Sequence, residues 1–229
     1  MDNYIQYNDL TEVDKITFYK KTYTHVALGV LVFILVEYVF LSIPAITKIA
    51  LSLTQGKMWL VMLGGFMLIT TMAEKMAMNS HDRTKQYLGY GLYIIAEAFI
   101  FIPLLYIATQ MEGGEVILKQ AAILTLSLFT GLSMIVIFTK KDFSFMRRFL
   151  TIGFVIALGL IVAGLLFGFN LGLWFSVGMI ILAAGSILYQ TSNMVHKYSN
   201  DQYVAAALGL FASLMLLFWY ILQIFLSRD

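Results

Sequence analysis

Cysteine is absent from the 229-residue chain, and proline occurs only twice. Without a thiol, the chain can form no disulfide, present no thiolate nucleophile and bind no metal through sulfur. Charged residues are also scarce: they make up 12% of the sequence, about half of the roughly 25% found in ordinary globular domains. Hydrophobic residues, by contrast, make up 60%. This composition is typical of a membrane protein and predicts a single polytopic membrane domain.

Common enzyme motifs are absent too. The chain contains neither the HExxH motif of zinc proteases nor the G-x-S-x-G motif of serine hydrolases, and no glycine-rich phosphate loop follows a strand-like stretch. The last hydrophobic stretch has no lysine, which excludes a retinal Schiff base there. We therefore expect no enzymatic activity, no cofactor, no bound metal and no nucleic-acid partner.

Seven apolar segments are each long enough to cross a bilayer as a helix, which takes about 20 residues. They are residues 24–44, 58–78, 88–109, 116–138, 149–169, 173–189 and 203–226. Residues 1–23 combine lysines with aromatic residues, which predicts a cytoplasmic amphipathic segment at the membrane surface; no cleavable signal peptide is expected there. Residues 24–229 are predicted to form one all-α domain of seven transmembrane helices.

The last segment carries small residues along one side. Ala205, Gly209 and Ser213 follow one another at steps of four, and small residues at this spacing let helix backbones approach closely in lipid. The rest of the segment is almost wholly apolar. We therefore expect this seventh helix to lie at the centre of the bundle, surrounded by the other six.

The positive charges indicate an orientation. If the N-terminus is cytoplasmic, eleven of the 15 lysines and arginines lie on the cytoplasmic side. These are Lys15, Lys20, Lys21, Lys75, Arg83, Lys85, Lys140, Lys141, Arg147, Arg148 and Lys197; the outer four are Lys48, Lys57, Lys119 and Arg228. Because cytoplasmic loops carry an excess of lysine and arginine, we expect the N-terminus inside and the C-terminus outside.

Two carboxylates inside the spans are candidate functional residues, because a charge at the centre of a membrane helix costs about 2.5–3.5 kcal/mol on insertion scales. Glu97 is the deepest, and Glu37 lies in the outer half of the first span. Each could be a structural carboxyl that holds helices together through hydrogen bonds, or a ligand for an ion or proton in a polar cavity. We treat both as candidates for an ion pathway.

Three histidines are expected near the cytoplasmic surface: His25, His81 and His196. No two of them show the i, i+4 spacing of a helix-borne zinc pair. We interpret them as solvated side chains in preference to metal ligands.

Four sequence features together indicate a family. The stretch FYKKTY at residues 18–23 precedes the first span, GYG at residues 89–91 opens the third span, Pro103 lies further along it, and TKKDFSF at residues 139–145 separates the fourth and fifth. With seven spans in about 230 residues, the chain resembles the Bax inhibitor-1 (transmembrane Bax inhibitor motif) family, in its bacterial form, over nearly its whole length.

The resemblance implies a fold with a central seventh helix, and a location in the bacterial cytoplasmic membrane. Members of this family look like pH-sensitive calcium leak channels, some bacterial ones restrain a membrane-anchored AAA protease, and animal ones suppress cell death. We therefore expect a cation leak channel, with calcium as the ion. The alternative is a non-conducting regulator that binds a membrane protease or another membrane partner. A polar path with Glu97 facing the seventh helix would favour the channel, and a dry bundle would favour the regulator.

The resemblance also implies a cytoplasmic latch, which departs from the family pattern here. In pH-sensing members, two aspartates near the cytoplasmic ends of the sixth and seventh helices share a proton, with an arginine nearby. The matching positions in this chain are Gln190, Ser213 and Arg83. Because an amide and a hydroxyl do not titrate as a carboxylate pair does, we expect the proton switch of the family to be absent. Uncharged hydrogen bonds among the three side chains could preserve the latch.

Overall fold

The computed structural model describes residues 11–78 and 82–227, and this part of the chain forms eight helices and no strand. The helices are α1 (Glu12–Ser42), α2 (Pro44–Leu53), α3 (Met58–Met78), α4 (Arg83–Gln110), α5 (Gly114–Thr139), α6 (Met146–Phe167), α7 (Gly172–His196) and α8 (Tyr203–Leu226). All except α2 are long and apolar enough to cross a membrane. The prediction of an all-α membrane protein with seven spans is therefore confirmed.

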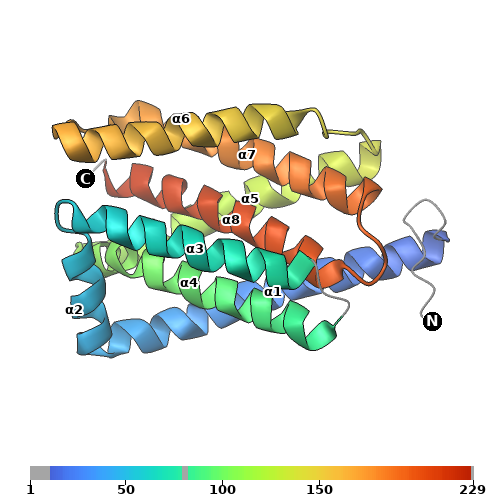
Figure 1. The fold of residues 1–229 in the computed structure, drawn as a ribbon, viewed down its shortest axis with the longest axis horizontal. Helices are drawn as coiled ribbons and strands as arrows, with labels where there is room; N and C mark the ends of the chain where they lie inside the picture. The colour runs from blue at the N-terminus through green and yellow to red at the C-terminus, as the bar shows by residue number, and fades with distance from the viewer. Residues whose placement is uncertain (1–10, 79–81, 228–229) are drawn as a thin grey trace.

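Helix α2 is an element that the sequence analysis missed, because its 10 residues are too few to cross a bilayer. It begins with Pro44, whose fixed φ and missing N–H suit the first turn of a helix. In Figure 1, α2 lies across one end of the bundle, nearly perpendicular to the long helices. Its buried side chains are Thr47 and Ala50.

Helix α1 begins well before the first apolar segment. Thr11 caps it: the Thr11 hydroxyl accepts a hydrogen bond from the Asp14 N–H, and the Asp14 carboxylate accepts one from the Thr11 N–H. The helix then continues without a break from Glu12 to Ser42. Phe18 lies within the segment that we expected at the membrane surface, but only 2% of it is exposed.

Helix α8 is the most buried of the spans, with 72% of its apolar window inside the protein. It packs against α1, α3, α4, α5 and α7, whereas α6 packs mainly against α7. Figure 1 shows α8 running between α6 and α7 on one side and α3, α4 and α1 on the other. A complete ring of six neighbours around α8 is thus not confirmed.

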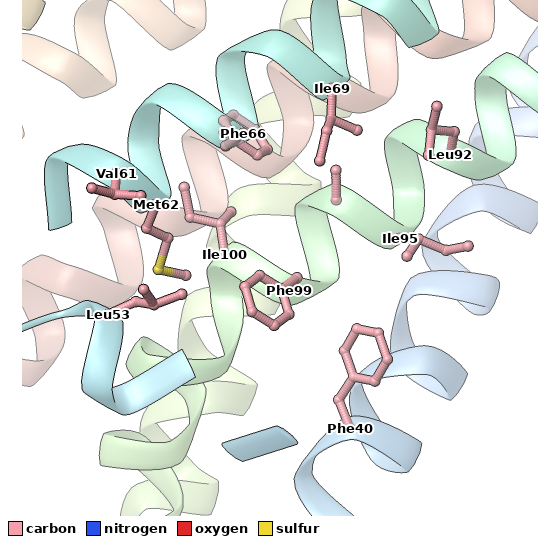
Figure 2. A pocket seen from close by; sticks show the side chains of 12 residues that line it. Phe40, Leu53, Val61, Met62, Phe66, Ile69, Leu92, Ile95, Phe99 and Ile100 are labelled. Atoms are coloured by element: carbon pink, nitrogen blue, oxygen red, sulfur yellow. The ribbon is translucent and has the colours of Figure 1, made fainter. Parts of the chain in front are cut away.

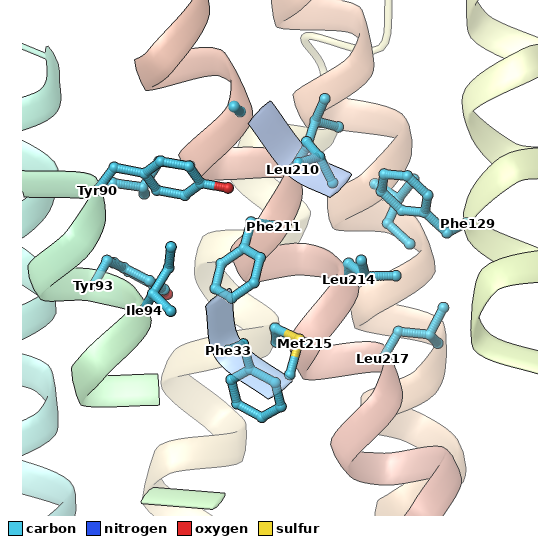
Figure 3. Packing of buried hydrophobic residues seen from close by; sticks show 14 of the residues in the cluster. Phe33, Tyr90, Tyr93, Ile94, Phe129, Leu210, Phe211, Leu214, Met215 and Leu217 are labelled. Carbon is cyan, nitrogen blue, oxygen red and sulfur yellow. The ribbon is translucent and has the colours of Figure 1, made fainter. Parts of the chain in front are cut away.

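Phe211 of α8 is the centre of an aromatic layer in the core (Figure 3). Its ring lies 6.4 Å from the ring of Phe33 on α1, and 5.9 Å and 6.3 Å from the rings of Tyr90 and Tyr93 on α4. All three pairs have the edge-to-face geometry that aromatic rings prefer. This layer joins α1, α4 and α8 in the middle of the bundle.

The orientation in the membrane stays a prediction, and it can be tested with reporters. The start of α1 and the end of α8 lie at opposite ends of the bundle (Figure 1). A reporter fused after residue 229 is expected to be active only outside the cytoplasm, and one inserted in the 139–145 loop only inside it, because of the bias in lysine and arginine. The opposite pair of results would reverse the orientation.

Candidate functional site

Glu97 lies midway along α4, and only 6% of it is exposed. One turn before it on α4, Tyr93 contacts Phe211 of α8; one turn after it, the ring of Phe101 lies 4.9 Å from that of Trp219 of α8. Side chains at i and i±4 share one face of a helix. Glu97 is therefore on the face of α4 that packs toward α8, and not on a lipid-facing side.

The hydrogen bonding of the Glu97 carboxyl is incomplete. Its Oε2 atom is buried and has no hydrogen-bond partner. The one hydroxyl in the middle of α8, that of Ser213, points to α7, where it lies 2.8 Å from the Ser186 hydroxyl. An unpaired polar atom in such a place is costly. Aromatic contacts between α4 and α8 lie on either side of the carboxyl, at Tyr93 and at Phe101.

Glu37 on α1 occupies a different place. It is 4% exposed, and neither of its carboxylate oxygens has a hydrogen-bond partner. It lines a pocket of about 490 Å³ formed by α1, α4, α5 and α8, and Glu97 is not among the residues of that pocket. The two predicted pathway residues are thus both buried carboxyls, but the described contacts do not bring them into one cavity.

Arg83, the first candidate latch residue, stands at the start of α4, and its guanidinium lies over the ring of Tyr203, 4.6 Å from the centroid. This is a cation–π contact with the first residue of α8. Lys21 of α1 lies over the same ring at 5.4 Å. Arg83 therefore ties the start of α4 to the start of α8 through an aromatic ring.

Gln190 and Ser213, the other two candidate latch residues, share the α7–α8 interface. The Gln190 side chain packs against Gly209: a Cβ built on that glycine would lie 2.8 Å from the Gln190 Oε1. Ser213, one turn further along α8, is 3% exposed and bonds to Ser186 and to the Gly209 carbonyl. Gln190 of α7 thus packs against the turn of α8 that contains Gly209, and Ser213 lies on the next turn of α8. Arg83 does not join them but stacks on Tyr203.

A hydrogen-bonded chain near the same end of the bundle was not foreseen. Nδ1 of His25 is 2.7 Å from the Lys21 carbonyl, Nε2 is 2.9 Å from the Tyr87 hydroxyl, and that hydroxyl is 3.4 Å from the hydroxyl of Tyr203. Both ring nitrogens of His25 thus have protein partners, although these hydrogen bonds lie at the exposed surface of the bundle. This series of hydrogen bonds links α1, α4 and α8. Its residues are far apart in the sequence and meet only because the three helices pack together.

Ser192 on α7 is a second residue that the sequence did not single out. It is fully buried, accepts a hydrogen bond from the Phe143 N–H at 2.9 Å, and donates one to the Asp142 carboxylate at 3.2 Å. It thereby holds the 139–145 loop against α7. Within the loop, the Ser144 N–H also donates to Asp142, at 2.8 Å.

These contacts favour the ionised form of Asp142. Ser144, through its side chain and its backbone N–H, and then the Ser192 hydroxyl, lower the pKa of this carboxyl. A lowered pKa in the folded state means that the carboxylate stabilises the loop above the ordinary aspartate pKa of about 3.9. That contribution is lost as the pH falls through the lower folded value. The loop is therefore fully anchored at neutral pH.

Ser192→Ala is expected to release the loop without unfolding the bundle. The variant loses a hydrogen bond to a carboxylate, and such bonds contribute about 1.5–3 kcal/mol. Trypsin should therefore cut after Lys140 and Lys141 at least about tenfold faster in nanodiscs. The control is Ser127→Ala, an exposed serine of α5 that bonds only to its own helix at the Ile123 carbonyl. Equal cleavage rates in both variants would contradict the anchoring role.

Among residues 11–78 and 82–227, no three histidine, aspartate or glutamate side chains gather closely enough to hold a metal ion. His81, the second of the three histidines considered above, lies outside the described residues. A cation that meets Glu37 or Glu97 would therefore not find a cage of three such side chains.

Comparison with known proteins identifies relatives of the chain. A family model described as "Inhibitor of apoptosis-promoting Bax1" matches residues 15–229. An uncharacterised protein of Pseudomonas aeruginosa is 36% identical over 140 residues, which cover 61% of this chain and 59% of that protein. The "Protein LIFEGUARD 4" of Arabidopsis thaliana is 29% identical over 156 residues, 62% of this chain and 58% of that protein. In both, the match spans little more than half of the relative.

A longer match is found in Escherichia coli. The "Modulator of FtsH protease YccA" is 29% identical over 197 residues, which cover 83% of this chain and 85% of that protein. The protein from another E. coli strain, called "Inner membrane protein YccA", matches equally well. The family match covers nearly all of the chain, including every helix from α2 to α8 and most of α1. The chain is therefore an integral membrane protein that belongs to the Bax inhibitor-1 family.

Proposed function

We propose that the protein is a cation leak channel of the membrane, and that the contact between α4 and α8 is its gate. Calcium is the ion that the family resemblance implies. The observation that carries the proposal is Glu97: a buried carboxyl, midway along α4, on the face toward α8, with an oxygen that lacks a partner. A passing cation would supply the interaction that this oxygen lacks.

One carboxylate suits a leak better than a storage site. Calcium prefers six to eight oxygen ligands, so a single carboxylate binds it weakly, and conduction requires binding that is weak enough to let the ion leave. The aromatic contacts of Tyr93 and Phe101 with α8 close the route on both sides of Glu97. In this proposal the packed arrangement is the closed form, and opening separates α4 from α8.

Glu97→Gln tests the proposal in liposomes that contain only the purified protein. An amide keeps the volume of the side chain but offers a dipole where a cation requires a charge, so calcium flux is expected to fall at least about tenfold. Glu112→Gln, an exposed carboxyl in the turn between α4 and α5, should leave the flux unchanged. A correctly folded Glu97→Gln protein with wild-type flux would overturn the proposal.

A second candidate function is modulation of a membrane-anchored protease, and it is favoured by the long match to the E. coli modulator of FtsH. The surface for it would be the 139–145 loop, in which the bonds from Ser192 fix the backbone beside the exposed Lys140 and Lys141. Reconstitution with a purified protease of the FtsH class separates the two functions. A protein that slows proteolysis, loses that effect on charge reversal of both lysines, and conducts no cations would support the modulator and overturn the channel.

A further inference from the structure

The pocket that Glu37 lines opens on the lipid side of the bundle. Most of the residues that line it come from α1 and α5, and the others come from α4 and α8. Several of the α1 and α5 residues that line it are themselves exposed, among them Ile34, Tyr38 and Leu126. Because both helices are membrane spans, a pocket that is open between them faces hydrocarbon and not water.

Two ionisable side chains interrupt an otherwise largely apolar lining: Glu37 and Lys119. Glu37 lies five residues before the end of α1, and Lys119 five residues after the start of α5. At 1.5 Å per residue, each is about 7.5 Å from the end of its helix. These two helix ends lie on the same side of the membrane, since α1 and α5 are the first and fourth spans. The two side chains thus stand at similar depth.

The two side chains do not pair with each other. No nitrogen–oxygen distance of 4 Å or less joins Lys119 to a carboxylate in the described part of the chain, and both oxygens of Glu37 are buried without a partner. Burial of an unsatisfied carboxyl is costly, and a buried polar group without a partner in a native structure calls for a ligand or another explanation. The pocket therefore contains a hydrogen-bonding group and a cation that are both available.

The chemistry of the lining selects the occupant. Apolar walls do not suit a bare ion, and a water-soluble molecule would have to cross lipid to reach the mouth. The neighbouring pocket between α1, α2, α3 and α4, of about 330 Å³, is lined by apolar side chains such as Phe40, Met62 and Phe99 and has no charged residue (Figure 2). It could take any hydrocarbon. Of these two pockets, the Glu37 pocket adds ionisable groups at a fixed depth, and these match an amphiphile.

We propose that this pocket binds a phospholipid of the surrounding leaflet, with one acyl chain inside, the protonated Glu37 carboxyl donating a hydrogen bond to an ester carbonyl and the Lys119 ammonium paired with the phosphate. Along a phospholipid the ester groups lie deeper than the phosphate, so Lys119, which starts at the depth of Glu37, has to reach outward to meet the phosphate. A lysine near the end of a span can reach the head-group level by extending its side chain. The volume of about 490 Å³ is within the range of small-molecule sites.

The bound lipid would have a structural consequence. It would fill the gap between α1 and α5 beside Glu37 and Lys119, whereas Tyr23 of α1 and Phe129 of α5 are in edge-to-face contact further along these helices. The lipid would thus stabilise the packing around the pocket, whose lining includes Phe33 and Met215. This role depends on neither cation conduction nor protease binding.

The first test is lipid retention measured by native mass spectrometry of the detergent-purified protein. One phospholipid per protein is expected to remain bound in the wild type and in Glu37→Gln, because an amide can also donate a hydrogen bond. Retention should fall about three- to tenfold in Lys119→Ala and in Glu37→Leu. Lys48→Ala, an exposed lysine of α2 on the same side, is the matched control and should match the wild type.

The second test does not depend on whether Glu37→Leu folds. Dioleoyl phosphatidylglycerol is added to delipidated wild type and compared with its ether-linked analogue, which lacks the ester carbonyls. The ester lipid should raise the Tm more than the ether lipid does. Equal effects of the two lipids, equal retention in Lys119→Ala and Lys48→Ala, or co-purification of a different amphiphile such as a free fatty acid would each overturn the proposal.

Discussion

Replacing Gly89 by valine is expected to cause a large loss of stability, because this glycine lies where α4 approaches α3 most closely. A Cβ at residue 89 would lie 2.6 Å from the Ala73 carbonyl oxygen and 2.9 Å from the Ala77 nitrogen. Both are backbone atoms of α3, so no side chain can turn away to make room. Relief requires the two helices to separate, and overpacking of this kind costs about 1–3 kcal/mol or more.

Gly91 provides the matched control for this variant. It is in the same helix, two residues further on, and a Cβ built there meets nothing within 4 Å. Valine at either position carries the same intrinsic helix propensity, so the comparison isolates the clash with α3. In thermal unfolding, Gly89→Val should melt at least about 5 °C below Gly91→Val. Equal melting temperatures would show that α3 can move aside at little cost.

The GYG stretch also shows how far the sequence could lead. The resemblance singled out residues 89–91, but it treated the two glycines alike. The structure distinguishes them: Gly89 faces the backbone of α3, and Gly91 faces open space. Hydropathy was sufficient to predict the seven spans, because length and apolar character are properties of single segments. Which face of α4 meets α3 depends on how the helices pack, and one sequence does not contain that information in readable form.

The same limit explains the missed and misplaced residues. The burial of Glu97 and Glu37 could be predicted from their depth in apolar segments. Their lack of hydrogen-bond partners could not, because it depends on side chains from other helices. Ser192 was not singled out for a similar reason: its partners, Phe143 and Asp142, are about 50 residues away along the chain. Helix α2 was missed because a span-length criterion rejects a helix of 10 residues.

Restoring the two aspartates of the family, with Gln190→Asp and Ser213→Asp together, is expected to make the stability of the protein strongly dependent on pH. Both positions are in the α7–α8 interface, at Gly209 and at the next turn of α8. Two carboxylates placed there would repel each other and would be desolvated, so the pair would still hold a proton at neutral pH. Unfolded aspartates release theirs near pH 4.

The sign of the effect follows from this difference. The folded variant binds more protons than the unfolded chain at neutral pH, so its stability falls as the pH rises through the range in which the shared proton leaves. Over one to two pH units in which the folded state binds one more proton than the unfolded state, the free energy of unfolding falls by about 1.4–2.7 kcal/mol. This corresponds to about 3–10 °C in Tm. The double variant should therefore melt lower at pH 8 than at pH 5 by that amount, relative to the wild type.

The control is Gln190→Asn combined with Ser213→Asn, which has side chains of the same size as the double aspartate but no titrating group. Its melting curve should run parallel to that of the wild type between pH 5 and 8. In liposomes, the double aspartate should also acquire a step in cation flux with pH that the wild type lacks, since ionisation of the pair changes how α7 and α8 pack. A steep acid-activated step in the wild type that survives removal of Glu97 and of all three histidines would contradict this account, because Gln190 and Ser213 have no proton to exchange in that range.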